Sequence, residues 1–96
     1  MDRVNIIYIP HGGKPFEMEI DCTLESFQSM VDGYFDYIMA DVNNALIFNA
    51  DLEHPLDGNT FVVGFPSGRK VWTDTTLSVA DVNRILERRE HDIIRN

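Results

Sequence analysis

Apolar and polar positions near the N-terminus follow the pattern of a β-hairpin. Residues 4–9 are rich in β-branched and aromatic side chains and are apolar on both faces, which is typical of a central strand. Residues 16–21 alternate strictly between apolar and acidic, which is the period of a half-buried strand. The segment between them holds two glycines between two prolines, so it can continue neither strand nor helix. We therefore expect an antiparallel pair joined by a turn at residues 10–15.

Two later segments have the spacing of amphipathic helices. The first covers residues 24–31, with Thr23 as its N-cap and Gly33 placed for a left-handed C-terminal cap. The second begins after Ser78, which forms a variant capping box with Asp81 three residues later. Each helix presents one apolar stripe, so each is expected to pack on a sheet.

Three further apolar runs predict strands, at residues 34–39, 45–48 and 60–65. Residues 41–44 predict a turn, and residues 69–72 predict a short edge strand. The element order is then β-β-α-β-β-β-α in a single α+β domain spanning residues 1–96. We expect a mostly antiparallel sheet with both helices on one face.

Composition excludes several classes of protein. Ninety-six residues with 44% hydrophobic and 25% charged side chains are typical of one small globular domain. One cysteine cannot form an intramolecular disulfide, and it leaves a thiolate zinc site short of ligands. No apolar run reaches the ~18–20 residues of a membrane span, and no signal peptide is visible. We therefore expect a cytoplasmic protein with no membrane partner, no metal and no cofactor.

Charge is unevenly distributed along the chain. The formal net charge is −8, from 16 acidic and eight basic residues. Residues 1–60 carry a balance of −9, whereas residues 61–96 carry +1. An acidic body repels phosphate backbones, so direct nucleic-acid binding is not expected. It attracts basic partners instead, although many small proteins are acidic simply to remain soluble.

A set of motifs resembles a known family. Residues 19–28 read Glu-Ile-Asp-Cys-Thr-Leu-Glu-Ser-Phe-Gln, and residues 30–35 read Met-Val-Asp-Gly-Tyr-Phe. With the preceding Gly-Lys-Pro turn and the later Thr-Phe-Val-Val-Gly at residues 60–64, this resembles the domain of unknown function 3846 family over residues 4 to about 65. The resemblance implies an origin in phages, plasmids and other mobile elements, often beside antirestriction genes. The family has no established chemistry, so it assigns no catalytic residue.

The most distinctive candidate surface is a row of carboxylates on the second strand. Glu17, Glu19 and Asp21 lie on one face at intervals of about 6.6–6.8 Å, from a rise of ~3.3–3.4 Å per residue. That spacing is close to the separation of phosphates along a nucleic-acid strand. With Asp32 and Asp36 they predict an acidic interaction face that imitates nucleic acid. The alternative is that these charges keep an exposed strand soluble and discourage edge pairing.

Basic residues provide a second candidate surface. An anion-binding patch is predicted from Lys14, Arg69, Lys70, Arg84 and Arg88. Such a patch could hold a phosphate-bearing small molecule or an acidic protein surface. The alternative is a solvated helix face together with an ordinary hairpin turn around Lys14.

Residues with catalytic or ligating chemistry form no recognisable motif. His11, His54 and Cys22 show no pairing of nucleophile and base, so no catalytic residue is assigned and an enzyme is not expected. The acidic loop at residues 51–57 does not have EF-hand spacing and is interpreted as solvated. Four aromatic residues are predicted to be core rather than a base-stacking platform: Tyr34, Tyr37, Phe48 and Trp72.

The sequence therefore predicts a non-catalytic binding protein of mobile-element type that engages a host component, such as a DNA-binding or defence protein. It would act by acidic mimicry of nucleic acid or by sequestering a phosphorylated small molecule. The alternative is a structural or regulatory module that forms homo-oligomers through an exposed sheet edge and has no ligand. A small hydrolase is the least favoured hypothesis.

Overall fold

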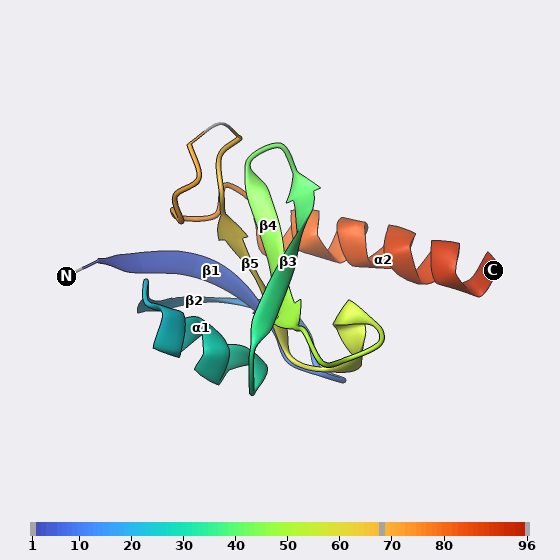
Figure 1. The fold of residues 1–96 in the computed structure, drawn as a ribbon. Helices are drawn as coiled ribbons and strands as arrows, with labels where there is room; N and C mark the ends of the chain where they lie inside the picture. Colours follow the sequence, from blue (N-terminus) through green and yellow to red (C-terminus); the bar gives the residue numbers. More distant parts are fainter. Residues whose placement is uncertain (1, 68, 96) are drawn as a thin grey trace.

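The computed structural model describes residues 2–67 and 69–95. Within these ranges the chain forms one α+β domain, in which five strands make an antiparallel sheet flanked by helices (Figure 1). The elements are β1 (Arg3–Ile9), β2 (Phe16–Asp21), α1 (Leu24–Val31), β3 (Phe35–Asp41), β4 (Asn44–Asn49), a 3₁₀ turn (Pro55–Asp57), β5 (Thr60–Gly64) and α2 (Val79–Arg95). The predicted fold class and element order are confirmed. Residues 69–72 are not a strand, and the nearest pairing is an isolated bridge between Thr73 and Gly64.

The strands lie in the order β2-β1-β5-β4-β3, and each neighbouring pair is antiparallel. The predicted hairpin is confirmed, with a register that runs from Arg3 opposite Asp21 to Tyr8 opposite Phe16. All of β5 is buried in the middle of the sheet. The two edges of the sheet are therefore β2 and β3.

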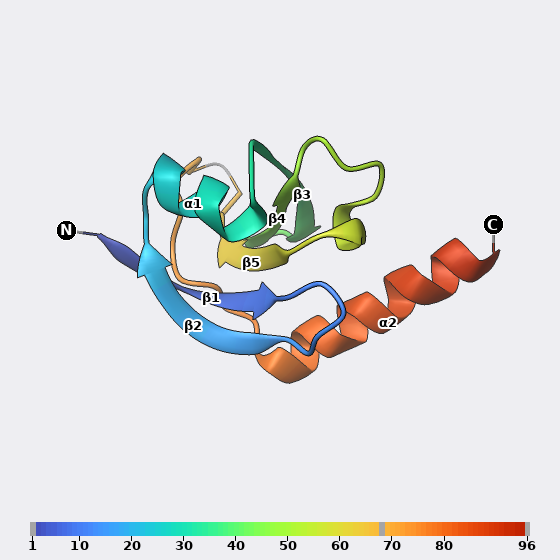
Figure 2. The same ribbon diagram turned by 90° about the horizontal axis from the view of Figure 1, so that it is seen from below.

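The helices lie on opposite faces of the sheet, so the prediction that both cover one face is wrong (Figure 2). Phe27 and Val31 of α1 share a core cluster with Ile6 of β1. Val82 of α2 belongs to a second cluster with Ile7. Because successive strand residues point to opposite faces, a strand that is apolar at both Ile6 and Ile7 needs cover on both sides.

The ends of α1 are fixed by side-chain and backbone caps. The Thr23 hydroxyl accepts a hydrogen bond from the Ser26 N–H at 3.1 Å, as predicted for an N-cap. The left-handed residue at the other end is Asp32, with φ of 63°, rather than the predicted Gly33. The Gly33 N–H closes the helix by donating to the Gln28 carbonyl at 3.0 Å.

The start of α2 has the predicted capping box. The Ser78 N–H donates to the Asp81 carboxylate at 3.0 Å, and the Asp81 N–H donates to the Ser78 hydroxyl at 3.1 Å. The bond from the Ser78 N–H, with help from the Arg84 guanidinium, holds the pKa of Asp81 below its usual value. From this point α2 runs past the sheet toward the C-terminus (Figure 1).

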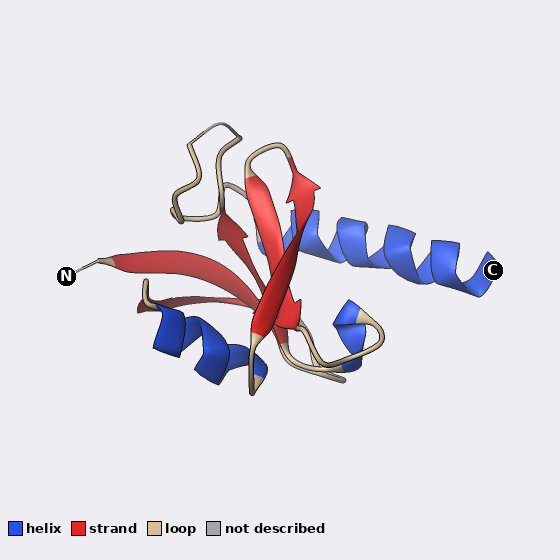
Figure 3. Ribbon diagram, viewed as in Figure 1, coloured by secondary structure: helices blue, strands red, loops and turns tan. Residues whose placement is uncertain are grey.

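A non-regular segment, residues 73–76, bridges β1 and β5 where these strands separate. Gly64 and Thr73 exchange two backbone hydrogen bonds, at 2.9 and 2.8 Å. The Thr75 N–H donates to the Asn5 carbonyl at 2.9 Å, and the Asn5 N–H donates to the Asp74 carboxylate at 2.8 Å. Figure 3 shows this part of the chain as loop beside the end of β5. We call it the 73–76 bridge.

Asn44 fastens the 73–76 bridge to the sheet. The sequence predicts that this residue lies in a turn, but it begins β4 and has no exposed surface. Its Nδ2 donates to Asp41 Oδ1 and to Thr76 Oγ1, both at 2.9 Å. Its Oδ1 accepts from Thr75 Oγ1 at 2.7 Å and from the Thr76 N–H at 3.1 Å. The buried amide therefore has a partner for both donors and for its acceptor.

Candidate functional site

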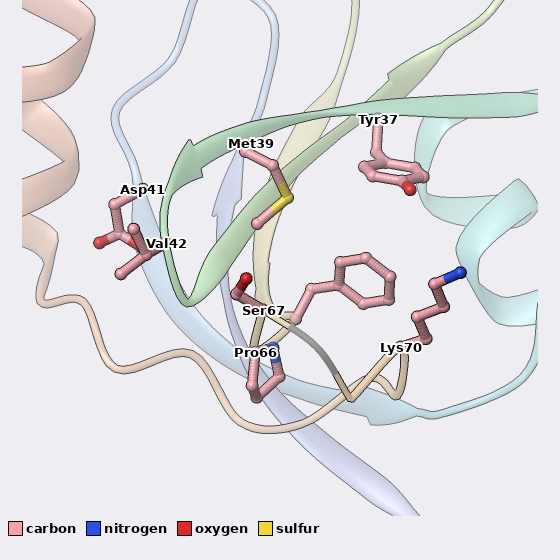
Figure 4. Close-up of a pocket in the computed structure, with 8 residues that line it drawn as sticks. Tyr37, Met39, Asp41, Val42, Pro66, Ser67 and Lys70 are labelled. Atoms are coloured by element: carbon pink, nitrogen blue, oxygen red, sulfur yellow. The ribbon is translucent and has the colours of Figure 1, made fainter.

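An open pocket of about 540 Å³ lies between β3 and the loop after β5, which comprises residues 65–67 and 69–72 (Figure 4). Its walls come from two segments that are distant in sequence. The lining residues are Tyr37, Met39, Asp41 and Val42 on one side, and Phe65, Pro66, Ser67 and Lys70 on the other.

The pocket exists because part of the α1 face is left uncovered at β3. The register of β3 on β4 places Tyr37 opposite Ile47 and Met39 opposite Ala45, and both partners belong to the core cluster beneath α1. Tyr37 and Met39 therefore point to that face, yet they remain 41% and 40% exposed. Figure 4 shows both side chains directed from the strand toward the loop that carries Pro66 and Ser67.

An aromatic cluster supports the floor of the pocket. The rings of Phe65 and Trp72 lie 4.4 Å apart, and Tyr37 meets Phe65 edge-on at 5.2 Å. Trp72 continues the contact inward to Phe27 of α1 at 5.3 Å. The pocket wall is thus continuous with the core, which favours a preformed shape.

The aromatic residues predicted as core divide into two groups. Trp72 packs against the α1 core cluster, and Phe48 is half-buried. Tyr34, with 72% of its surface exposed, and Tyr37 are not core, so the prediction is wrong for these two. The apolar pattern of this edge strand does not indicate how much of the strand α1 covers.

Backbone hydrogen bonds hold the loop after β5 against the turn between β3 and β4. The Phe65 N–H donates to the Asn43 carbonyl at 2.8 Å, and the Ser67 N–H donates to the Val42 carbonyl at 3.1 Å. Both walls of the pocket are therefore tied together at the Val42 end.

The outer edge of β3 presents backbone groups beside this pocket. The Ala50 N–H donates to the Tyr34 carbonyl at 2.9 Å, which makes Tyr34 and Ala50 a hydrogen-bonded pair of the ladder. Such pairs alternate with non-bonded pairs in an antiparallel ladder. In this register Phe35, Tyr37 and Met39 fall in the non-bonded pairs, so their N–H and C=O groups point away from β4.

Asp36 covers part of that edge. Its Oδ1 accepts a hydrogen bond from the Tyr37 N–H at 2.8 Å, which is one of the outward donors. A carboxylate placed in this way discourages unselective pairing of an edge strand.

The acidic row of β2 lies at the other edge of the sheet. Glu17, Glu19 and Asp21 are all exposed, and they point to the α2 face because Met18 and Ile20 pack toward α1. Arg3 approaches two of them, with its Nε 3.4 Å from Glu19 Oε1 and 3.5 Å from Asp21 Oδ1. These exposed contacts partly neutralise the row.

The predicted acidic face is not one continuous surface. Asp32 follows α1 on the opposite face from the β2 row, where its Oδ2 accepts a hydrogen bond from Asn59 Nδ2 at 3.0 Å. Asp36 lies on β3, at the far edge of the sheet. The structure therefore brings together Glu17, Glu19 and Asp21 but separates them from Asp32 and Asp36.

The predicted anion-binding residues are also dispersed. Lys70 lines the pocket beside β3, with Arg69 next to it in the chain. Arg84 and Arg88 line a different hollow of about 250 Å³ on α2, where Arg84 pairs with Asp81. Lys14 is exposed in the turn between β1 and β2.

Two histidines contact the backbone of one residue, Leu56. His54 Nδ1 accepts a hydrogen bond from the Leu56 N–H at 3.1 Å, and His11 Nδ1 lies 3.3 Å from the Leu56 carbonyl oxygen. Cys22 is at the opposite end of the β1–β2 hairpin, where its N–H donates to the Asp2 carbonyl at 3.0 Å. Among the described residues, no group of three or more His, Cys, Asp or Glu side chains is arranged to hold a metal ion.

Cys22 is expected to react slowly with alkylating agents. Burial raises the pKa of its thiol, and the nearby Asp2 carboxylate raises it further, so less of the nucleophilic thiolate is present at neutral pH. Mass spectrometry of the iodoacetamide adduct should show slower labelling in the native chain than in the urea-unfolded chain. Faster labelling of the native chain would mark Cys22 as an activated nucleophile instead.

No helix in the described ranges is long and apolar enough to cross a membrane. Comparison of the chain with known protein families, curated proteins and solved structures finds no match. The resemblance to the domain of unknown function 3846 family stays a prediction.

Proposed function

We propose that this chain is a non-catalytic binding protein that engages a partner protein through the pocket between β3 and the loop after β5. The observation that carries this proposal is a preformed apolar pocket directly beside the open edge of β3. Exposed apolar patches rimmed by polar residues mark protein–protein interaction sites or ligand-binding grooves. Here Tyr37, Met39 and Val42 supply the apolar surface, and Lys70 lies at the rim.

The resemblance to proteins of mobile elements suggests where the partner belongs. On that basis the chain acts in the cytoplasm of a bacterial host, and its partner is a host protein. The divided positions of the carboxylates favour the pocket over an extended imitation of nucleic acid. The separation of Lys70 from Arg84 and Arg88 likewise gives less support to capture of a phosphorylated small molecule.

Site-specific photo-crosslinking tests the proposal because the candidate surfaces lie at different edges. A photoreactive amino acid is placed at Val42, which is 71% exposed at the pocket rim, or at Glu17 on β2. Irradiation in the native host should give a discrete protein adduct from position 42, and Met39→Glu should abolish that adduct.

The matched position and a matched variant define the contrary outcomes. An adduct from position 17 that disappears with Glu17→Gln and Glu19→Gln would support acidic mimicry and contradict the pocket. An adduct whose mass is that of two copies of this chain would support the self-associating module instead. Absence of a discrete adduct from position 42 would also contradict the proposal.

A further inference from the structure

We infer that the edge of β3 binds an extended, basic segment of the partner by strand addition, with one apolar side chain of that segment seated in the pocket. This inference rests on the proposed function and names the chemistry of its partner. It requires free backbone groups, a pocket on the correct face and a feature that selects basic segments.

The backbone requirement is met on β3. Phe35, Tyr37 and Met39 direct their N–H and C=O groups away from β4, at the spacing that an added strand needs. Their side chains lie on the face that holds the pocket. A residue of the added strand opposite Tyr37 or Met39 would therefore direct its side chain over the pocket, because directly paired side chains lie on one face.

The other edge of the sheet is chemically different. The Cys22 N–H donates to the Asp2 carbonyl at 3.0 Å, so by the same alternation the outward backbone groups of β2 belong to Glu17, Glu19 and Asp21. All the residues whose backbone groups point outward on β2 carry carboxylates, and such an edge resists strand pairing. On β3 the corresponding residues are two aromatics and a methionine, so β3 is the receptive edge.

Asp36 provides the preference for a basic segment. Its carboxylate occupies the Tyr37 N–H, which an added strand needs as a donor. A segment with an arginine or lysine near this position offers the carboxylate a charged partner and frees the N–H for pairing. A neutral or acidic segment leaves the carboxylate without that compensation, so it is disfavoured.

Charge also argues against a second copy of this chain as the occupant. β3 carries Asp36 and Asp41 but no basic residue, and the whole chain has a net charge of −8. Two such strands side by side would bring like charges together, which is unfavourable. A basic segment complements Asp36 on the β3 edge, whereas a second β3 does not. Lys70 belongs to the opposite wall of the pocket, on the loop after β5, so the site requires an apolar side chain in the pocket and a basic one at Asp36.

Binding of matched synthetic peptides tests this inference on the full chain. The basic probe is a short peptide in which one arginine stands on each side of a phenylalanine. Threonines fill the remaining positions. The acidic control has glutamate in place of each arginine. Trp72 is the chain's single tryptophan and stacks on Phe65 of the pocket, so its fluorescence reports occupancy. At low ionic strength the basic peptide should bind at least about tenfold more tightly than the acidic one.

Two variants with the same change of charge separate selection at Asp36 from general attraction. Asp36→Asn keeps an oxygen that can accept from the Tyr37 N–H but removes the charge, so the preference for the basic peptide should fall to about twofold. Glu17→Gln, on the opposite edge, should leave most of the preference in place. Amide NMR shifts caused by the basic peptide should be largest at residues 35–41.

Several results would overturn the inference. These are equal affinity for the two peptides, shifts centred on residues 16–21, equal effects of the two variants, and no binding of either peptide at millimolar concentration. If the crosslink from position 42 still captures a partner, any of these results removes strand addition but leaves the pocket as the binding site. Loss of that crosslink removes both proposals.

Discussion

Asn44→Asp is expected to lower the free energy of unfolding by about 3–5 kcal/mol, which is a large part of the roughly 5–15 kcal/mol that stabilises a native domain. The substitution keeps the shape of the side chain but replaces a donor with an ionised oxygen. Nδ2 of Asn44 now donates to Asp41 Oδ1 at 2.9 Å, and a carboxylate oxygen there would face a second carboxylate. Because Asn44 has no exposed surface, water cannot relieve that repulsion.

Urea unfolding followed by Trp72 fluorescence measures this effect, and two further substitutions are compared with it. Asn43→Asp introduces the same charge one residue earlier at an exposed position, so a change within about 0.5 kcal/mol is expected. Thr60→Val removes a hydroxyl that is buried without a hydrogen-bond partner in the described structure, and it should stabilise the fold by about 1 kcal/mol. Equal losses from Asn43→Asp and Asn44→Asp would show that the buried hydrogen bonds of Asn44 do not hold the fold.

Features encoded by neighbouring residues could be predicted from the sequence. Thr23 and Ser78 are caps because their partners lie three residues away, and both caps form as expected. The hairpin of β1 and β2 follows from one strand pattern, one turn and a second strand pattern. Each of these structures depends on residues that lie close together in the sequence.

The placement of the two helices on opposite faces could have been predicted from the apolar pattern of β1. Residues 4–9 are apolar on both faces, with Ile6 packed toward α1 and Ile7 packed toward α2. A strand that is buried on both sides requires a layer on each side. Placing both helices on one face would have left Ile7 and Val62 in water.

The candidate site could not be predicted because its parts are distant in sequence. Asn44 bonds to Thr75 and Thr76, which lie 31 and 32 positions later. The pocket likewise joins β3 to the loop after β5, so neither wall has a complete pattern by itself. The carboxylates of residues 17–21 lie close together in the sequence and form a recognisable pattern. The sequence therefore favoured the β2 edge over the β3 edge as the interaction surface.

Gly64→Ala is expected to destabilise the chain by about 3 kcal/mol or more and to weaken partner binding at the same time. A Cβ at this position would overlap the Asp74 carbonyl oxygen and the Thr73 hydroxyl, and it would lie 2.8 Å from the Thr73 carbonyl oxygen. The 73–76 bridge would have to move away from β5 and lose the two backbone hydrogen bonds between Gly64 and Thr73. Those bonds close the loop after β5, so one wall of the pocket should move with the bridge.

Gly12→Ala is the matched change that separates this effect from the general cost of replacing a glycine. Gly12 has φ of +76°, and a Cβ added there would meet no atom within 4 Å, so only backbone strain of about 1–2 kcal/mol is expected. Urea unfolding compares the two variants, and the wavelength of Trp72 emission reports the pocket wall in each native state. Gly64→Ala should shift the emission to the red and reduce the crosslink from position 42, whereas Gly12→Ala should change neither. A Gly64→Ala chain with native emission and an undiminished crosslink would show that the pocket keeps its shape without the bridge.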